Sequence, residues 1–170
     1  MRVAVTGTHR TGKTTLVEAL ADALPRYTMF AEPYVLLEED GYELGHPPTV
    51  EDFEQQLRRS LDVIAAAPAH ALFDRCPLDF LAYLRALDAD VDAWLPDVRA
   101  AMTAIDLVVV LSIGDRIVVS ADEDPALRRR VDELVTAIVL EDAYDLELEV
   151  LAPTGSLDAR VRDVLASIRG

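Results

Sequence analysis

The chain has 170 residues, of which 51% are hydrophobic and 28% are charged, so it is long enough for one well-buried globular domain. Its 31 acidic residues against 16 basic ones give a formal net charge of -15, which would repel a phosphate backbone, and we expect no nucleic-acid partner. The single cysteine excludes an internal disulfide and a cysteine-based metal cluster, and the longest apolar runs have only the length of a strand. These features predict a cytoplasmic protein with no membrane partner and leave the oligomeric state open.

Short β-branched segments alternate along the chain with longer segments of helical period. In chain order we expect a strand at 2–6, a helix at 13–24, a strand at 27–31, a helix at 50–67, a strand at 69–73, helices at 77–87 and 91–104, a strand at 106–113, a helix at 125–140, a strand at 147–151 and a helix at 156–168. This alternation is typical of a parallel sheet with crossover helices, and it predicts the α/β fold class.

A glycine-rich segment, GTHRTGKT at residues 7–14, follows the first predicted strand and precedes the first predicted helix. It fits the pattern G-x-x-x-x-G-K-[ST] in the strand–loop–helix context that this phosphate-binding pattern requires. Glycines let the backbone wrap closely around a phosphate, and the helix N-terminus adds a favourable dipole. We predict that the nucleotide is bound by the eight residues of this segment and by the residue that follows it: Gly7, Thr8, His9, Arg10, Thr11, Gly12, Lys13, Thr14 and Thr15.

Lys13 is the only lysine in a chain whose other basic residues are all arginine. A compact ammonium can reach between the β- and γ-phosphate oxygens and follow the transferring group, whereas a planar guanidinium is bulkier. We therefore expect Lys13 to be catalytic and to lie on an exposed loop. We expect Mg²⁺ to be held by the hydroxyl of Thr14 and by Asp74, which ends the third predicted strand, directly or through water. The alternative, a chance glycine-rich turn with a surface lysine, is disfavoured by both flanking elements.

Two absences narrow the class of nucleotide-binding protein. The chain has no asparagine and no second lysine, so it lacks the Asn-Lys-x-Asp motif by which guanine-specific switches read their base. A large mechanochemical ATPase module would need more chain and usually a strand ending in Asp-Glu, whereas the third predicted strand ends HALFDRC. Both of these classes are therefore disfavoured.

Two further segments resemble known kinases. FAEP at 30–33 resembles the Glu-Pro that closes the second strand of deoxynucleoside kinases, and FDRCPLDFLAYL at 73–84 resembles their Asp/Glu-Arg-Ser segment. The whole chain is similar to small AAA-type ATP-binding proteins related to the kinase domain of bifunctional nicotinamide riboside kinases. This resemblance implies a single domain, 1–170, with the three-layer P-loop NTPase fold: a five-stranded parallel sheet in the order 2-3-1-4-5, helices on both faces and a helical lid at about 114–145.

The resemblance also implies a kinase that uses ATP and Mg²⁺ to phosphorylate a hydroxyl of a nucleoside-like small molecule. In such kinases the glutamate that closes the second strand accepts the proton of the acceptor hydroxyl, and Glu32 matches it. The arginine after the third-strand carboxylate binds near the acceptor oxygen and the transferring phosphate, and Arg75 matches that role. From the residues alone, Glu32 could instead be a solvated loop carboxylate, and Asp74 with Arg75 a structural ion pair. Cys76 we interpret as a packing residue.

The only side-chain amides of the chain are Gln55 and Gln56, on the helix predicted at 50–67. In deoxynucleoside kinases a glutamine on the corresponding helix pairs with the nucleobase, and an amide can donate and accept at once. Adjacent helix positions point about 100° apart, so at most one faces the site, and we favour Gln56, with a solvated surface as the alternative. Tyr34 and Phe53 could both stack on a ring of the acceptor, but a core role is the better interpretation for Phe53, so we favour Tyr34.

The region between the fourth and fifth predicted strands is rich in arginine. Resemblance to other P-loop kinases suggests that lid arginines neutralise the transferring charge and stack on adenine, and Arg116 and Arg128 are our candidates, with Arg128 catalytic. The alternative is that they form salt bridges with neighbouring acidic residues. In related kinases the loop before the last helix borders the adenine, which implies a backbone contact from Gly155. The rival function is a nucleotide-binding regulator or slow NTPase, in which Glu32 has no acceptor to deprotonate.

Overall fold

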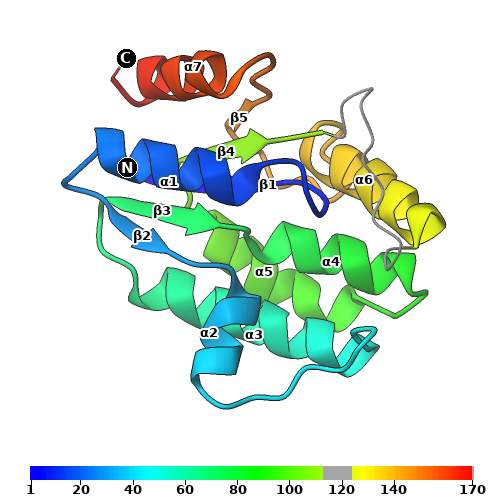
Figure 1. Cartoon of the computed structure of the whole chain (residues 1–170). Helices are drawn as coiled ribbons and strands as arrows, with labels where there is room; N and C mark the ends of the chain where they lie inside the picture. The colour runs from blue at the N-terminus through cyan, green and yellow to red at the C-terminus, as the bar shows by residue number, and fades with distance from the viewer. Residues whose placement is uncertain (113–123, 170) are drawn as a thin grey trace.

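The computed structural model describes residues 1–112 and 124–169 (Figure 1). Its elements in chain order are β1 (Arg2–Thr6), α1 (Lys13–Ala23), β2 (Thr28–Phe30), α2 (Pro33–Glu39), α3 (Val50–Ala66), β3 (Ala71–Asp74), α4 (Pro77–Ala86), the 3-10 helix η1 (Asp92–Trp94), α5 (Leu95–Met102), β4 (Leu107–Val110), α6 (Pro125–Val139), β5 (Val150–Leu151) and α7 (Leu157–Arg169). Each predicted strand and helix has a counterpart here, in several cases shorter at its ends. Within the described residues, no helix has the length and apolar character needed to cross a membrane.

The strands form one parallel sheet in the order β2-β3-β1-β4-β5, which confirms the predicted order. β1 lies in the middle and pairs with β3 and β4, so that Val3 stands opposite both Leu72 and Leu107. Side chains alternate between the two faces: Val3 belongs to one buried core and Ala4 to the other. This is why the central strands are apolar throughout, as a parallel sheet covered on both faces requires.

Helices cover both faces of this sheet and give the predicted three layers (Figure 1). α1 and α7 pack together on one face, where Leu16, Leu20 and Val164 are fully buried. α3, α4 and α5 pack against one another on the opposite face, and α6 packs against α4. The core of that face includes Leu57 and Leu81.

The helix α2 is absent from the sequence prediction. Pro33 begins it, because a proline fits the first turn of a helix, and Glu32 is its N-cap residue. Its seven residues are too few for a helical period to stand out, so the sequence alone suggested a strand end followed by a loop. α2 packs against α3 and so fixes the direction in which the chain leaves β2 at Glu32.

The helix predicted at 91–104 is also different, because it is divided into η1 and α5. A proline lies in the first turn of α5, where its missing N–H costs no hydrogen bond.

The parallel direction of the strands brings their carboxyl ends to one edge of the sheet. β1 runs into the glycine-rich loop, β2 ends just before Glu32, and β3 ends at Asp74, followed by Arg75. Ligands of open α/β sheets bind outside this edge.

Candidate active site

The glycine-rich loop needs glycine at both of the glycine positions of its sequence pattern. Gly7 has a φ of 141°, and a Cβ there would lie 2.2 Å from the carbonyl oxygen of Leu111. Gly12 has a φ of 89° and is the N-cap residue of α1, whose first turn carries no acidic residue. The left-handed conformation of Gly12 turns the chain directly into α1, so the free N–H groups of the first helical turn open toward the loop. The loop therefore has the form of an anion-binding site.

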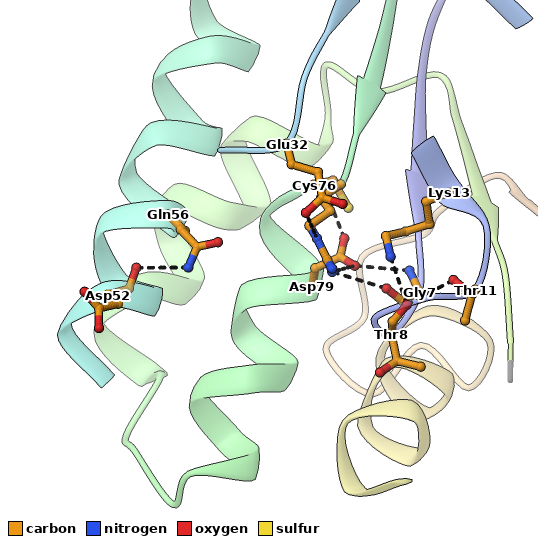
Figure 2. A network of polar contacts seen from close by, with 10 residues as sticks. Gly7, Thr8, Thr11, Lys13, Glu32, Asp52, Gln56, Cys76 and Asp79 are labelled. Carbon is orange, nitrogen blue, oxygen red and sulfur yellow. Dashed lines mark hydrogen bonds and ion pairs between the residues drawn. The ribbon is translucent and has the colours of Figure 1, made fainter. Parts of the chain in front are cut away.

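Lys13 is buried, with 3% of its surface exposed, and the expectation that it lies on an exposed loop is wrong. Its Nζ donates a hydrogen bond of 2.8 Å to the carbonyl oxygen of Thr8, which also accepts one of 3.0 Å from the hydroxyl of Thr11 (Figure 2). Burial, together with the positive charge of Arg75, lowers the pKa of Lys13 to about 8. The ammonium lies inside the curve of the loop, where a phosphate oxygen would compete with Thr8 for it.

The carboxylate of Asp74 lies at the end of β3. Asp74 is 2% exposed, and its Oδ1 has no hydrogen-bond partner among the described residues. Burial raises its pKa to about 6, against the opposing effect of a hydrogen bond from Thr14. A carboxylate and a hydroxyl fit Mg²⁺, which takes one or two protein oxygens and completes its shell with water and phosphate oxygens. Nowhere in residues 1–112 and 124–169 do three His, Cys, Asp or Glu side chains gather into a metal site of their own.

Arg75 and Glu32 form an ion pair beside the loop, where Arg75 Nη1 also donates to Gly7 O. Arg75 Nε lies 2.8 Å from Glu32 Oε2, and the guanidinium lies 5.7 Å from the centre of the Tyr83 ring. Burial would raise the pKa of Glu32, but the charge and hydrogen bond of Arg75 hold it below its ordinary value. For Arg75 burial acts in the opposite direction and would lower the pKa, but Tyr83, Glu32 and Asp79 together raise it above its ordinary value. Both side chains therefore stay charged at neutral pH.

Asp79, to which the sequence analysis gave no role, is a further member of this group. It is fully buried and accepts hydrogen bonds from Gly7 N at 3.1 Å, Arg75 Nη1 at 3.2 Å and Cys76 N at 3.0 Å. The available signal was its place three residues after the N-cap Cys76, where an acidic side chain closes a capping box. That signal predicts a helix start, and its link to Gly7 appears only in the fold.

A cavity of about 410 Å³ opens beside Glu32 and Arg75. It brings together six residues predicted to bind ligands: His9, Glu32, Tyr34, Gln56, Arg75 and Arg128. Its wall also contains residues with no predicted ligand-binding role: His46, Pro48, Phe53, Phe80, Tyr83, Asp124 and Leu127.

The aromatic part of the wall is built by α3 and α4. Phe53, which was assigned to the core, is 8% exposed and belongs to the core, but it also lines the cavity and stacks on Tyr83 at 4.6 Å with 11° between the rings. Gln56 is 5% exposed, and its Nε2 donates to the carbonyl oxygen of Asp52 at 3.3 Å. That bond leaves the amide oxygen as an acceptor, and Figure 2 shows it turned away from Asp52, toward the side on which Glu32 lies.

The remaining predicted residues lie elsewhere. Arg10 and Thr15 are exposed, and Arg116 falls outside the described residues. Gly155, with a φ of 87°, lies just before α7 and is not part of the cavity wall. α7 does reach the glycine-rich loop, because Arg160 Nη1 donates to Thr11 O at 3.3 Å.

The placement of Cys76 agrees with a packing role. The residue is fully buried in the core, and burial raises the pKa of its thiol.

A protein-family model described as an AAA domain matches residues 2–160. The chain belongs to this AAA domain family. A search of curated proteins finds no match for this AAA domain protein.

Solved structures share its fold. A deoxyadenosine kinase from M. mycoides, with dCMP and dCDP bound, matches with a TM-score of 0.69 and 12% identity over 99% of this chain and 98% of that one. The NadR protein in complex with NAD and AMP-PNP matches with a TM-score of 0.69 and 20% identity over 98% of this chain and 48% of that one. NadR in complex with NR gives a TM-score of 0.70 at 18% identity, over 98% and 49% of the two chains. This AAA domain protein thus spans about half of NadR, and the likeness confirms the P-loop kinase fold.

Proposed function

We propose that this AAA domain protein is an ATP-dependent small-molecule kinase that transfers the γ-phosphate to a hydroxyl of a nucleoside-like acceptor. The observation that carries the proposal is the place of Glu32, paired to Arg75 at 2.8 Å, in the wall of a cavity of about 410 Å³ next to the glycine-rich loop. The proteins of similar fold lend support, because their structures hold nucleotides such as AMP-PNP and dCMP.

The nucleotide side of the proposed site is the loop of residues 7–14. Lys13 and the backbone N–H groups of the loop bind the β- and γ-phosphates, so the ammonium must leave the carbonyl of Thr8 for a phosphate oxygen. Thr14 and Asp74 would hold Mg²⁺, which neutralises charge on the phosphates. Arg128 on α6 lines the same cavity, and in the proposal it neutralises charge on the transferring group.

Two further parts of the proposal rest on the resemblance to P-loop kinases. One is that Arg116 and Gly155 contact the nucleotide. The other is that the chain is a single domain with a helical lid at about 114–145.

The acceptor hydroxyl would lie between Glu32 and the γ-phosphate. Its oxygen forms a bond to the γ-phosphorus, the bond from that phosphorus to the β–γ bridging oxygen breaks, ADP leaves, and the hydroxyl proton passes to Glu32. Since Arg75 holds the pKa of Glu32 low, Glu32 is ionised and ready to accept the proton, although it is a weak base. A weak base suits phosphoryl transfer, in which the proton leaves late and positioning contributes most.

The rest of the cavity supports a ring-bearing acceptor. Phe53 and Tyr83 form a flat stacked wall, and Tyr34 lines the same space. The amide oxygen of Gln56 offers a hydrogen-bond acceptor to a donor on the ring edge. A nucleoside combines such a ring with a sugar hydroxyl.

An acceptor screen tests the proposal. The purified chain is incubated with MgATP and a panel of ribonucleosides and deoxynucleosides, ADP formation is followed, and phosphorylated products are identified by mass spectrometry. We expect at least one nucleoside to accelerate ADP formation and to gain one phosphate, and Lys13→Ala to abolish both. Slow ATP hydrolysis that no nucleoside accelerates would instead support a nucleotide-binding regulator or slow NTPase.

A further inference from the structure

We propose that Asp79 is a positioning residue that couples the glycine-rich loop to Arg75, and so couples nucleotide binding to the acceptor side of the cavity. The inference rests on the proposed function, because it takes the loop as the nucleotide site. Its basis is the set of contacts of Asp79: one oxygen, Oδ1, accepts from both Gly7 N at 3.1 Å and Arg75 Nη1 at 3.2 Å, and the other accepts from Cys76 N at 3.0 Å (Figure 2).

Gly7 is tied to this pair through both of its peptide groups. Its N–H donates to Asp79, and its carbonyl oxygen accepts from Arg75 Nη1 at 3.3 Å. Gly7 also has little room to move, because the space of a Cβ is filled by the carbonyl of Leu111. A change in the position of the guanidinium is therefore passed to the first residue of the loop.

Arg75 is in turn oriented by carboxylates on two sides. Glu32 accepts from its Nε at 2.8 Å and Asp79 from its Nη1 at 3.2 Å, while Tyr83 lies under the guanidinium. Two carboxylates that bind different nitrogens fix the planar group in rotation as well as in position. An acceptor bound at Glu32 and Arg75 would thus meet a guanidinium whose orientation depends on Asp79.

Asp52 is a carboxylate at the same position of another helix, without the contacts to Gly7 and Arg75 that Asp79 makes. It too is the third residue of a helix, is 4% exposed and closes a capping box, with Thr49 on α3. Its other partners, Gly45 N and Tyr42 Oη, belong to the loop just before α3. Capping a helix start therefore does not require the contacts that Asp79 makes across 72 residues of sequence to Gly7.

The test measures MgADP affinity by titration calorimetry on the full chain, well below the unfolding temperature of each variant. The variants are Asp79→Asn, Arg75→Lys and the double variant, with Asp52→Asn as the matched control. We expect Asp79→Asn to weaken MgADP binding by roughly tenfold, the value of one well-placed hydrogen bond of a charged group, and Asp52→Asn to change it less than about twofold even if both lower the stability.

The double variant separates coupling from two independent effects. Arg75→Lys keeps the charge but cannot reach Glu32, Asp79 and Gly7 O together, so we expect it to weaken MgADP binding as well. If Asp79 acts through the shared contact at Gly7, Arg75→Lys adds less than about twofold once Asp79 is replaced. Effects that multiply would overturn the inference, because they show that the two residues act separately.

The remaining outcomes distinguish this inference from the proposed function. A wild-type chain that binds MgADP, with Asp79→Asn binding as tightly as Asp52→Asn, overturns the coupling and leaves the kinase proposal standing. A wild-type chain that does not bind MgADP overturns both. If Asp79→Asn does not fold, Arg75→Lys alone decides, because unchanged MgADP affinity in that variant shows that the guanidinium has no effect on the loop.

Discussion

Glu32 and Arg75 are 43 positions apart in the sequence and form an ion pair of 2.8 Å. The pairing of their strands brings them together: Phe30 of β2 stands opposite Phe73 of β3, and each charged residue comes two positions after its member of this pair. The two segments with the strongest resemblance to kinases are thus aligned by the register of the sheet. The proposed base and the proposed phosphate-binding arginine form one unit on the wall of the cavity.

Glu32→Gln tests the role of the base. Glutamine keeps the shape and can still accept from Arg75 Nε, but it cannot take a proton, so transfer to the acceptor should fall by roughly a hundredfold or more. MgATP affinity should stay near the wild-type value, as measured by calorimetry, and background hydrolysis should change little, since water can lose its proton to solvent. Glu39→Gln, an exposed carboxylate at the end of α2, is the control and should be unaffected. Wild-type transfer by Glu32→Gln across pH would make Asp74 the candidate base.

Lys13→Arg tests why this position is lysine. The ammonium is 3% exposed and enclosed beside Thr8 O, so a planar guanidinium should not fit. We expect both Lys13→Ala and Lys13→Arg to weaken MgATP binding by roughly 10- to 100-fold, as for the loss of a charge-assisted hydrogen bond. Both variants should remain folded, because Thr8 O keeps its bond from Thr11. Arg26→Ala, at an exposed site, controls for the loss of charge. Near-wild-type affinity in Lys13→Arg would show that charge alone suffices.

The strand–loop–helix unit at the start of the chain was predictable because its signals are local. The period of β1, the glycine pattern and the amphipathic α1 all lie within residues 2–23. The burial of Lys13 was not predictable, since the charged groups near it include Arg75, which follows β3, and Asp79 on α4, both far away in the sequence. Gln56 was favoured over Gln55 by its distance from Phe53 along the helix, and it lies in the cavity wall while its binding role stays a prediction.

Asp79 and Tyr83 show that local sequence patterns do not reveal contacts between residues far apart in the chain. Their positions in a helix were predictable, but Asp79 contacts Gly7 and Tyr83 contacts Phe53. Neither pair forms a sequence motif with a fixed spacing. Such contacts come from strand order and helix packing, which the sequence expresses only through the whole fold.

Asp74→Asn should raise stability at neutral pH. The pKa of this carboxyl is 3.8 ordinarily and about 6 in the folded protein, so the folded state holds the proton more tightly between those values. The free energy of unfolding therefore falls as the pH rises from about 4 to about 6, and the loss persists above pH 6. We expect Asp74→Asn to gain about 3 kcal/mol at pH 7 and less than about 1 kcal/mol near pH 4, while losing Mg²⁺-dependent nucleotide affinity.

Urea unfolding at pH 4, 5, 6 and 7 measures this effect, with Asp62→Asn as the control at an exposed position of α3. An equal gain at pH 4 and pH 7 would show that the charge of Asp74 is not its source.

Gly7→Ala tests the close approach of the loop to β4. The new Cβ would lie 2.2 Å from Leu111 O at a φ of 141°, so backbone must move, and we expect a loss of more than about 3 kcal/mol in the free energy of unfolding. Gly41→Ala separates backbone strain from collision, because Gly41 has a φ of 85° and, among residues 1–112 and 124–169, no neighbouring atom lies within 4 Å of its Cβ position. That variant should lose about 1 kcal/mol. Equal losses in urea titrations would mean that the collision is relieved at no cost.

The central place of β1 in the sheet has a consequence for biosynthesis. The neighbours of β1 are residues 71–74 and 107–110, which are synthesised about 65 and 100 residues later, or roughly 3–20 s later at ordinary elongation rates. During that time an apolar strand has both edges open to wrong partners. The glycine-rich loop is thus synthesised before the parts of β3, α4 and the segment at Leu111 that give it its shape.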